Sequence, residues 1–138
     1  MSVDTRIRDS FAAQTMMDTI GAQIEEISPG LVRIAAPILP GVRQQQGFGH
    51  AGLSFTLADT AAGYAALTRA PEGADVLTSE LKINLLAPAR GDRLIATGRV
   101  VKTGRRLVIA TAEVHAYDGD TETLIAIAQG TIVPVIPA

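Results

Sequence analysis

The sequence contains no cysteine and few aromatic residues, which make up 4% of the chain. Without cysteine the chain has no disulfide, no thiolate ligand for zinc and no cysteine nucleophile. It also lacks a run of basic residues, and its formal net charge is −2. Binding to nucleic acid is therefore not expected, because phosphate recognition needs concentrated lysine and arginine.

Long apolar segments are absent too. The longest, residues 124–138, is interrupted by two prolines, a glycine and a glutamine, so it is not expected to cross a bilayer. The N-terminus, "MSVDTRIRDSFAAQ", has two early acids and no apolar core, which argues against a secretory signal and favours a cytoplasmic location. The length of 138 residues, 47% of them hydrophobic, predicts one domain spanning residues 1–138.

Hydrophobic spacing and turn residues predict two helices and six strands. A short amphipathic helix is expected over residues 5–19, and a long helix over residues 50–68. The motif "SPG" predicts a hairpin turn, and residues 39–49 form a glycine- and proline-containing loop. The expected strands are residues 20–28, 31–38, 75–87, 92–103, 106–117 and 122–135.

The order of these elements predicts an α+β fold. No helical segment separates the last four strands, so the sheet is expected to be mainly antiparallel. The helix over residues 50–68 carries alanine and glycine on several sides, which is typical of a helix that is buried all round. A curved six-stranded sheet wrapped around this helix would bury it. The free edges of such a sheet favour pairing with another copy of the chain.

Asp59 is the one formally charged residue between His50 and Arg69. An isolated aspartate is commonly a solvent-facing residue with no special role. Here, however, its neighbours are apolar, and a partly desolvated carboxylate is a better base than a solvated one. Asp59 is therefore a candidate catalytic base.

The start of the same helix offers a second chemical group. Backbone N–H groups near Ala51 and Gly52 have no acceptor within the helix, so together with the helix dipole they can polarise a carbonyl group. Gly47 and Gly49 would allow a substrate to approach closely. His50 cannot pair with Asp59, because nine helical residues separate them by about 13.5 Å along the axis. A simple helix-capping role for His50 remains the alternative.

Ala51 and Asp59 are also too far apart to act on one carbonyl within one chain. Eight residues of helix span about 12 Å. If both groups act, they must come from two subunits related by a two-fold axis. The sequence thus indicates a site shared between copies.

The segment "GFGHAGLSFTLADTAAGYAA" resembles the PaaI-like group of hotdog-fold acyl-CoA thioesterases. The pattern of that group is approximately G-x-x-H-G-G-x-x-x-x-L-x-D-x-x-x-G. A second segment, "LKINLLAPAR", is similar to the strand that follows the helix in that group. The matching positions of the main pattern are Gly47, His50, Gly52, Leu57, Asp59 and Gly63.

This resemblance implies a hotdog fold, a homodimer or homotetramer with shared sites, and no metal or other cofactor, coenzyme A being part of the substrate. By position, Asp59 would be the base or nucleophile, and the Ala51 N–H would polarise the thioester carbonyl. His50 would orient the helix start, while Gln44 and Thr78 would help to place the carbonyl or water. Two departures from the pattern are Ala51 in place of glycine and Gln44 in place of asparagine.

The phosphates of coenzyme A require basic residues. The motif "KTGRR" supplies Lys102, Arg105 and Arg106, although an ordinary solvated turn explains the same residues; Arg90 and Arg93 are further candidates. No role is expected for His115. The expected function is hydrolysis of an acyl-CoA thioester. A noncatalytic acyl-ligand protein and an enoyl-CoA hydratase or dehydratase on the same fold are the alternatives.

Overall fold

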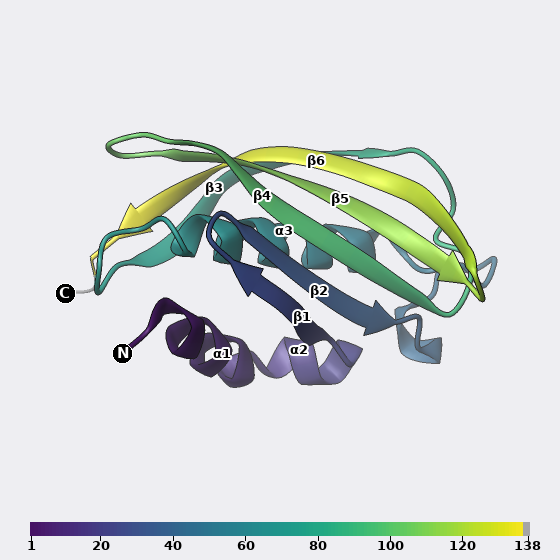
Figure 1. Ribbon diagram of the computed structural model, residues 1–138. Coiled ribbons are helices and arrows are strands. Elements are labelled where there is room, and N and C mark those ends of the chain that lie inside the picture. Colours follow the sequence, from purple (N-terminus) through teal and green to yellow (C-terminus); the bar gives the residue numbers. More distant parts are fainter. Residues whose placement is uncertain (137–138) are drawn as a thin grey trace.

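The longest helix of the chain lies in the concave side of a curved antiparallel sheet (Figure 1). The computed structural model describes residues 1–136, so the last two residues of the predicted domain lie outside it. The elements, in chain order, are α1 Val3–Ala13, α2 Thr15–Ile20, β1 Gln23–Ser28, β2 Leu31–Pro37, the short 3₁₀ helix η1 Pro40–Val42, α3 Ala51–Leu67, β3 Asp75–Leu85, β4 Arg93–Thr103, β5 Val108–Asp118 and β6 Thr121–Val135.

The sheet confirms the predicted fold class. Its strand order is β1-β2-β4-β5-β6-β3, and each neighbouring pair is antiparallel. Helix α3 connects β2 to β3, so the chain crosses the concave side of the sheet and β3 becomes an edge strand (Figure 1). No helix within residues 1–136 is long and apolar enough to cross a membrane.

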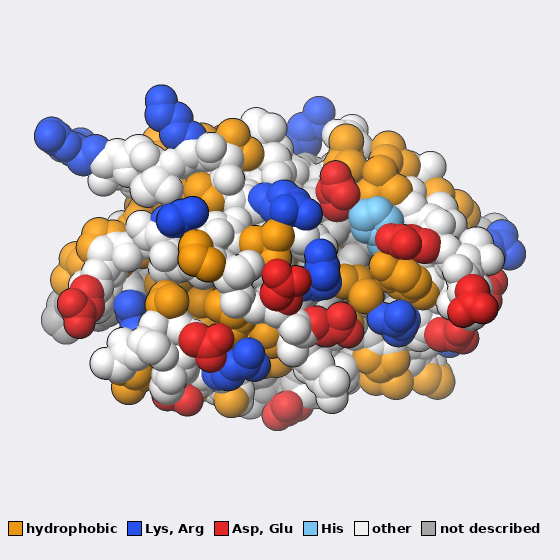
Figure 2. Space-filling model, viewed as in Figure 1, with side chains coloured by type: hydrophobic (Ala, Val, Ile, Leu, Met, Phe, Trp, Pro, Cys, Tyr) orange, Lys and Arg blue, Asp and Glu red, His pale blue; other side chains and the backbone are white. Residues whose placement is uncertain are grey.

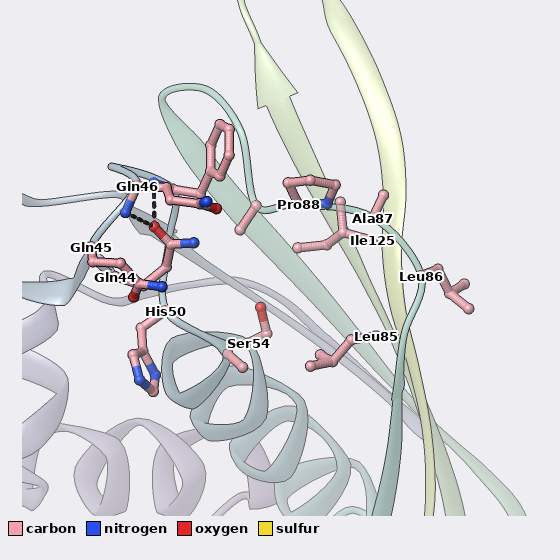
Figure 3. Close-up of a pocket in the computed structure, with 14 residues that line it drawn as sticks. Gln44, Gln45, Gln46, His50, Ser54, Leu85, Leu86, Ala87, Pro88 and Ile125 are labelled. Carbon is pink, nitrogen blue, oxygen red and sulfur yellow. Dashed lines mark hydrogen bonds between the residues drawn. The ribbon is translucent and has the colours of Figure 1, made fainter.

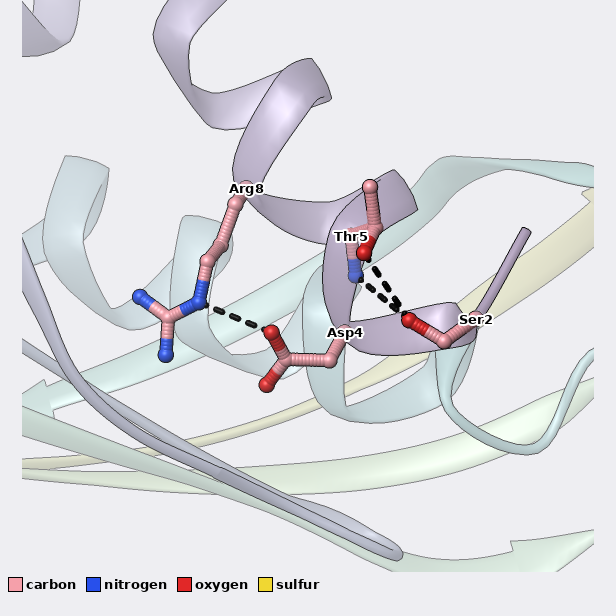
Figure 4. A network of polar contacts seen from close by, with 4 residues as sticks. All are labelled: Ser2, Asp4, Thr5 and Arg8. Atoms are coloured by element: carbon pink, nitrogen blue, oxygen red, sulfur yellow. Dashed lines mark hydrogen bonds and ion pairs between the residues drawn. The ribbon is translucent and has the colours of Figure 1, made fainter.

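The prediction of one continuous helix over residues 5–19 is wrong. Two helices form instead, because Gln14 has an extended backbone, with φ −82° and ψ 98°. Helix α1 starts at the N-cap Ser2, whose side chain accepts a hydrogen bond from the Thr5 N–H at 3.1 Å (Figure 4). An Arg8–Asp4 ion pair at 2.8 Å bridges the next turn. Spacing alone did not reveal the break, since both pieces place apolar residues toward the core.

Helix α3 lies unusually close to β4, and Gly98 makes that approach possible. A Cβ atom on Gly98 would lie 2.3 Å from the backbone carbonyl carbon and oxygen of Ala61. On the helix side, Ala58, Ala61 and Ala62 are fully buried. Small side chains on α3 and a glycine on β4 therefore let the two backbones touch.

Helix α3 is not buried all round, which corrects the expectation from its composition. One stripe of its surface is exposed or half-buried, and its members are three or four residues apart, as expected for one helix face. The residues of this open stripe are Gly52, Phe55, Thr56, Asp59, Thr60 and Gly63. The carboxylate of Asp59 thus lies on the one helix face that the protomer leaves partly uncovered.

Strand β3 forms an open edge beside this stripe. Along this edge the side chains of Leu77 and Leu85 are 61% and 57% exposed to solvent. A β-bulge interrupts the pairing of β3 with β6 between Thr78 and Glu80. An exposed apolar edge strand favours pairing with another strand.

We expect Gly98→Ala to lower the free energy of unfolding by about 3 kcal/mol, because the added methyl group overlaps the backbone of Ala61. Urea unfolding followed by circular dichroism measures the change. Gly41→Ala is the matched control, since a Cβ there meets nothing within 4 Å. Equal stability of the two variants would show that α3 does not depend on this contact.

Candidate active site

The loop before α3 is shaped by backbone hydrogen bonds that deliver residue 50 to the helix start. The Gln44 N–H donates to the Phe48 carbonyl oxygen at 2.9 Å, which closes a tight turn. The His50 N–H donates to the carbonyl oxygen of Val42 at 2.9 Å, and the Gly49 N–H donates to that of Ala89 at 2.8 Å. The loop is therefore fixed both to itself and to the segment that follows β3.

His50 is the N-cap of α3. Its backbone is extended, and its Nδ1 atom accepts a hydrogen bond from the Gly52 N–H at 2.7 Å. The Ala51 N–H, by contrast, donates to no acceptor among residues 1–136. Of the two N–H groups predicted at this helix end, Gly52 is thus satisfied by the histidine, and Ala51 retains a donor for a ligand.

A pocket of about 520 Å³ opens at this helix start (Figure 3). The glutamine side chains form one wall and aliphatic side chains form the facing wall (Figure 3). The imidazole of His50 points away from the space between the walls, as its capping role requires (Figure 3). The labelled lining residues are Gln44, Gln45, Gln46, His50, Ser54, Leu85, Leu86, Ala87, Pro88 and Ile125.

Gln44 has a structural role that its position before the motif did not reveal. Its Oε1 atom accepts hydrogen bonds from the N–H groups of Gln46 at 2.6 Å and Phe48 at 3.2 Å. This leaves the side-chain NH₂ as its free polar group at the pocket wall. Gln44 can therefore present only a donor to a ligand, which is the group that a carbonyl oxygen accepts from.

The three glycines predicted to contact substrate each have a local structural reason. Gly47 adopts φ +88°, a left-handed conformation that favours glycine. A Cβ on Gly49 would lie 3.0 Å from the Cβ of Ala89, and one on Gly52 would lie 3.0 Å from Nδ1 of His50. These glycines therefore let the loop and the cap form, whatever they contribute to binding.

Asp59 lies eight residues beyond Ala51 along α3, beside the edge strand β3. Its Oδ1 atom accepts a hydrogen bond from the hydroxyl of Thr78 at 2.7 Å. Among residues 1–136 no basic side chain lies within 4.0 Å of this carboxylate, and its Oδ2 atom accepts no hydrogen bond. The structure thus brings Asp59 and Thr78 together and leaves one carboxylate oxygen free.

Asp59 does not share the pocket at the helix start. It lines a separate pocket of about 240 Å³ that also includes Thr78. Because α3 is one continuous helix, Ala51 and Asp59 are separated by about 12 Å along its axis. The candidate base and the candidate carbonyl-binding group of one chain therefore belong to different pockets.

The β4–β5 turn, with Lys102, Arg105 and Arg106, lies at the Asp59 end of the sheet. Strand register shows this, because Thr103 pairs with Val108, Val108 with Ile132, and Ile132 with Thr78. Basic side chains project from the end of the molecule where the β4–β5 turn lies (Figure 2). Lys102, Arg105 and Arg106 are thus remote from Ala51 of the same chain.

Arg90 is a cation beside the helix-start pocket. Its guanidinium carbon lies 4.8 Å from the ring centroid of Phe48, a pocket residue, in a cation–π contact. Arg93 instead stacks on Tyr117 at 4.4 Å and approaches Glu25 at 4.0 Å. His115 lies 3.9 Å from Glu122 on the outer side of the sheet, and the structure gives it no place in either pocket.

Sequence reasoning missed three residues of the Asp59 pocket, which come from α1, from the residue between α1 and α2, and from α3. The Tyr64 hydroxyl lies 2.9 Å from the Ser10 hydroxyl and accepts a hydrogen bond from the Gln14 side chain at 2.5 Å. Ser10 and Gln14 are 54 and 50 residues away from Tyr64 in sequence, so no local motif connects them to it. The packing of α1 against α3 would have been needed to find them.

We expect His50→Ala to cost about 1 kcal/mol of stability, because it removes the acceptor for the Gly52 N–H. His50→Asn should retain most of that stability, since asparagine is a favoured N-cap. Thermal unfolding of both variants measures the difference. Since the His50 side chain is exposed, equal losses in the two variants would contradict a capping role.

Comparison with known proteins now gives the fold a family. The model of the thioesterase superfamily matches residues 46–123, which include α3, Asp59 and Thr78. A candidate esterase of Saccharolobus solfataricus is 30% identical over 92% of this chain and 82% of its own length. Another, from Halobacterium salinarum, is 34% identical over 84% of this chain and 82% of its own length.

Solved structures agree. The crystal structure of a thioesterase family protein from Silicibacter pomeroyi is 42% identical, has a TM-score of 0.96, and covers 99% of this chain and 100% of that one. The PaaI protein of E. coli shares the fold, with a TM-score of 0.85 and 21% identity over 96% of this chain and 93% of its own. Sequence, fold and motif together show that this chain is a hotdog-fold member of the thioesterase superfamily.

Proposed function

We propose that this protein hydrolyses acyl-CoA thioesters at sites formed between two copies of the chain. The observation that carries the proposal is that the two candidate catalytic groups lie at different places on one helix, α3. Its start offers a free Ala51 N–H, and its middle offers a carboxylate held by Thr78, in two separate pockets. A thioester is already activated, so a base and an oxyanion donor are sufficient for its hydrolysis.

The open edge strand supports the pairing of two copies. Thr78, near the start of β3, marks the Asp59 pocket, and Leu85, at the end of β3, lines the helix-start pocket. An antiparallel pairing of two β3 strands about a two-fold axis near Leu81 and Lys82 exchanges these two positions. Asp59 of one copy then lies beside the helix start of the other.

The same symmetry accounts for the basic residues. Lys102, Arg105 and Arg106 lie at the Asp59 end of their own chain. In the proposed pair, that end also receives the helix-start pocket and Arg90 of the second copy. Cations from both chains thus surround one composite site, which suits the phosphates of coenzyme A.

In the proposed reaction, the thioester carbonyl oxygen accepts a hydrogen bond from the Ala51 N–H, with the NH₂ of Gln44 as a second donor. Asp59 of the other chain takes a proton from water as the water oxygen bonds to the carbonyl carbon. The C–S bond then breaks, the carboxylic acid forms, and the departing thiolate takes the proton from Asp59. Direct attack by Asp59, through an anhydride that water then hydrolyses, uses the same groups.

Replacing Asp59 by asparagine tests the base. We expect Asp59→Asn to lower kcat by about 100-fold or more, because the amide cannot accept the proton. A panel of acyl-CoA substrates with detection of free thiol measures this. Asp18→Asn, an exposed carboxylate on α2, is the matched control and should retain activity. Full turnover by Asp59→Asn would refute the assignment, and a wild-type protein that binds but never releases thiol would be an acyl-ligand protein.

The helix-start donor can be removed without disturbing the helix. Ala51 is the first helical residue after the extended His50, a position that accepts proline. Ala51→Pro removes the N–H, and we expect kcat to fall by about 100-fold. Co-expressing Ala51→Pro with Asp59→Asn should restore about a quarter of wild-type activity, because about half of randomly assembled dimers are mixed and each mixed dimer contains one intact site of two. No recovery in verified mixed dimers would show that the two groups do not cooperate across chains.

A further inference from the structure

The pocket beside Asp59 ends in a polar cluster that hydrolysis does not require. Tyr64 is 5% exposed, and its hydroxyl meets Ser10 at 2.9 Å and the Gln14 side chain at 2.5 Å. All three residues and Asp59 line the same pocket of about 240 Å³. A ligand that fills this pocket would therefore contact the cluster.

Helix α1 holds the cluster in place from the opposite side. Ile7 is fully buried in the core, and the ring of Phe11 lies 6.3 Å from that of Tyr64 in a tilted arrangement. The Arg6 guanidinium donates to the carbonyl oxygen of Ala74, just before β3. Ser10 and Gln14 are therefore positioned by packing and not by the pocket itself.

The hydrogen-bonding groups of this cluster are not all used within it. Gln14 donates to Tyr64, and one hydroxyl hydrogen lies between Tyr64 and Ser10. The other hydroxyl hydrogen has no acceptor in this cluster, and residues 1–136 supply none elsewhere. The second side-chain N–H and the Oε1 atom of Gln14 likewise make no hydrogen bond within residues 1–136. The end of the pocket thus presents a free O–H donor beside an amide that can both donate and accept.

Gly63 keeps the wall between Asp59 and Tyr64 open. It lies one helical turn beyond Asp59 on the open stripe of α3, and a Cβ placed on it meets nothing within 4 Å. The backbone there is helical and unstrained, so this glycine is not required for the turn of the chain. Its effect is to leave space in the pocket.

Charge limits the kind of group that fits. The ionisable carboxylates in the pocket lining are Asp59 and Asp75, and no lysine, arginine or histidine lines it among residues 1–136. An anionic group at this end would be repelled. A neutral group that accepts a hydrogen bond would satisfy the free hydroxyl hydrogen, whereas an alkyl group would leave it unpaired.

We propose that this pocket is the acyl subsite and that it selects a compact acyl group ending in a neutral hydroxyl. The inference rests on the proposed function, because it places the scissile carbonyl at Asp59. The rise from Asp59 to Tyr64 is about 7.5 Å along α3, a span that a hexanoyl chain covers. Acyl groups of this length with a terminal hydroxyl would reach the Ser10–Gln14–Tyr64 cluster.

The test compares hexanoyl-CoA with 6-hydroxyhexanoyl-CoA and with the CoA thioester of adipic acid, with acetyl-CoA as a short reference. We expect kcat/KM for the hydroxylated substrate to be about tenfold above that for hexanoyl-CoA, because the alkyl end leaves a polar cluster unpaired. The adipic thioester, which carries a terminal carboxylate, should be the poorest of the three long substrates.

Variants separate the two features of the subsite. The triple variant Ser10→Ala/Gln14→Leu/Tyr64→Phe keeps the ring against Phe11 and removes every polar group of the cluster, so the hydroxyhexanoyl-to-hexanoyl ratio should fall toward one. Gly63→Ala should lower kcat/KM for both long substrates more than for acetyl-CoA, because its methyl group enters the pocket. Tyr117→Phe, whose hydroxyl bonds Glu122 on the outer sheet, is the matched control and should keep the wild-type ratio.

The outcomes distinguish this proposal from the proposed function. Hydrolysis of all substrates with a ratio near one in the wild-type protein overturns the subsite and leaves the thioesterase intact. If no substrate is hydrolysed, the proposed function fails. In that case, calorimetry with nonhydrolysable CoA thioethers bearing hexyl and 6-hydroxyhexyl groups still tests the subsite. Equal dissociation constants for the two thioethers would overturn it.

Discussion

The contact between Gly98 and the backbone of Ala61 is the constraint on which the rest of the molecule depends. It sets α3 directly on the sheet, with no side chain between them at that point. The helix can then neither rotate nor shift without meeting strand β4. The open stripe that carries Asp59 is consequently fixed toward β3, where Thr78 is in reach, and the helix start is fixed at the opposite end of the same strand. A looser interface would leave both ends of the helix without a defined direction.

The fold followed from the sequence because its signals are local. Within the strand predicted over residues 106–117, apolar residues alternate from Val108 to Ala116, and the structure buries this alternating set. The break at Gln14 was not predictable in this way, since the residues on either side keep a helical pattern. Gln14, whose extended backbone separates α1 from α2, donates to Tyr64, a contact across fifty residues.

The site followed from the sequence only in part, for the same physical reason. The structure brings together Asp59 and Thr78, two side chains that the resemblance named, and His50 caps α3, which was the alternative role given for it. The side-chain oxygen of Gln44, however, accepts hydrogen bonds from two backbone N–H groups of its own turn. The Arg90–Phe48 contact depends on two loops that meet only in the folded chain. Residue type and spacing identify candidate site residues. Which of their hydrogen-bond donors and acceptors stay free depends on neighbours that are brought together only by folding.

The bulge at Ser79 has a consequence for how the protein behaves at high concentration. Strand β3 is long, carries exposed leucines and is open at its edge, and these features promote fibril-like stacking of strands. The extra residue kinks the strand, and Lys82 places a charge at its centre, so a flat, continuous ladder cannot extend along it. The edge can therefore be occupied by one well-matched strand and still resist open-ended aggregation.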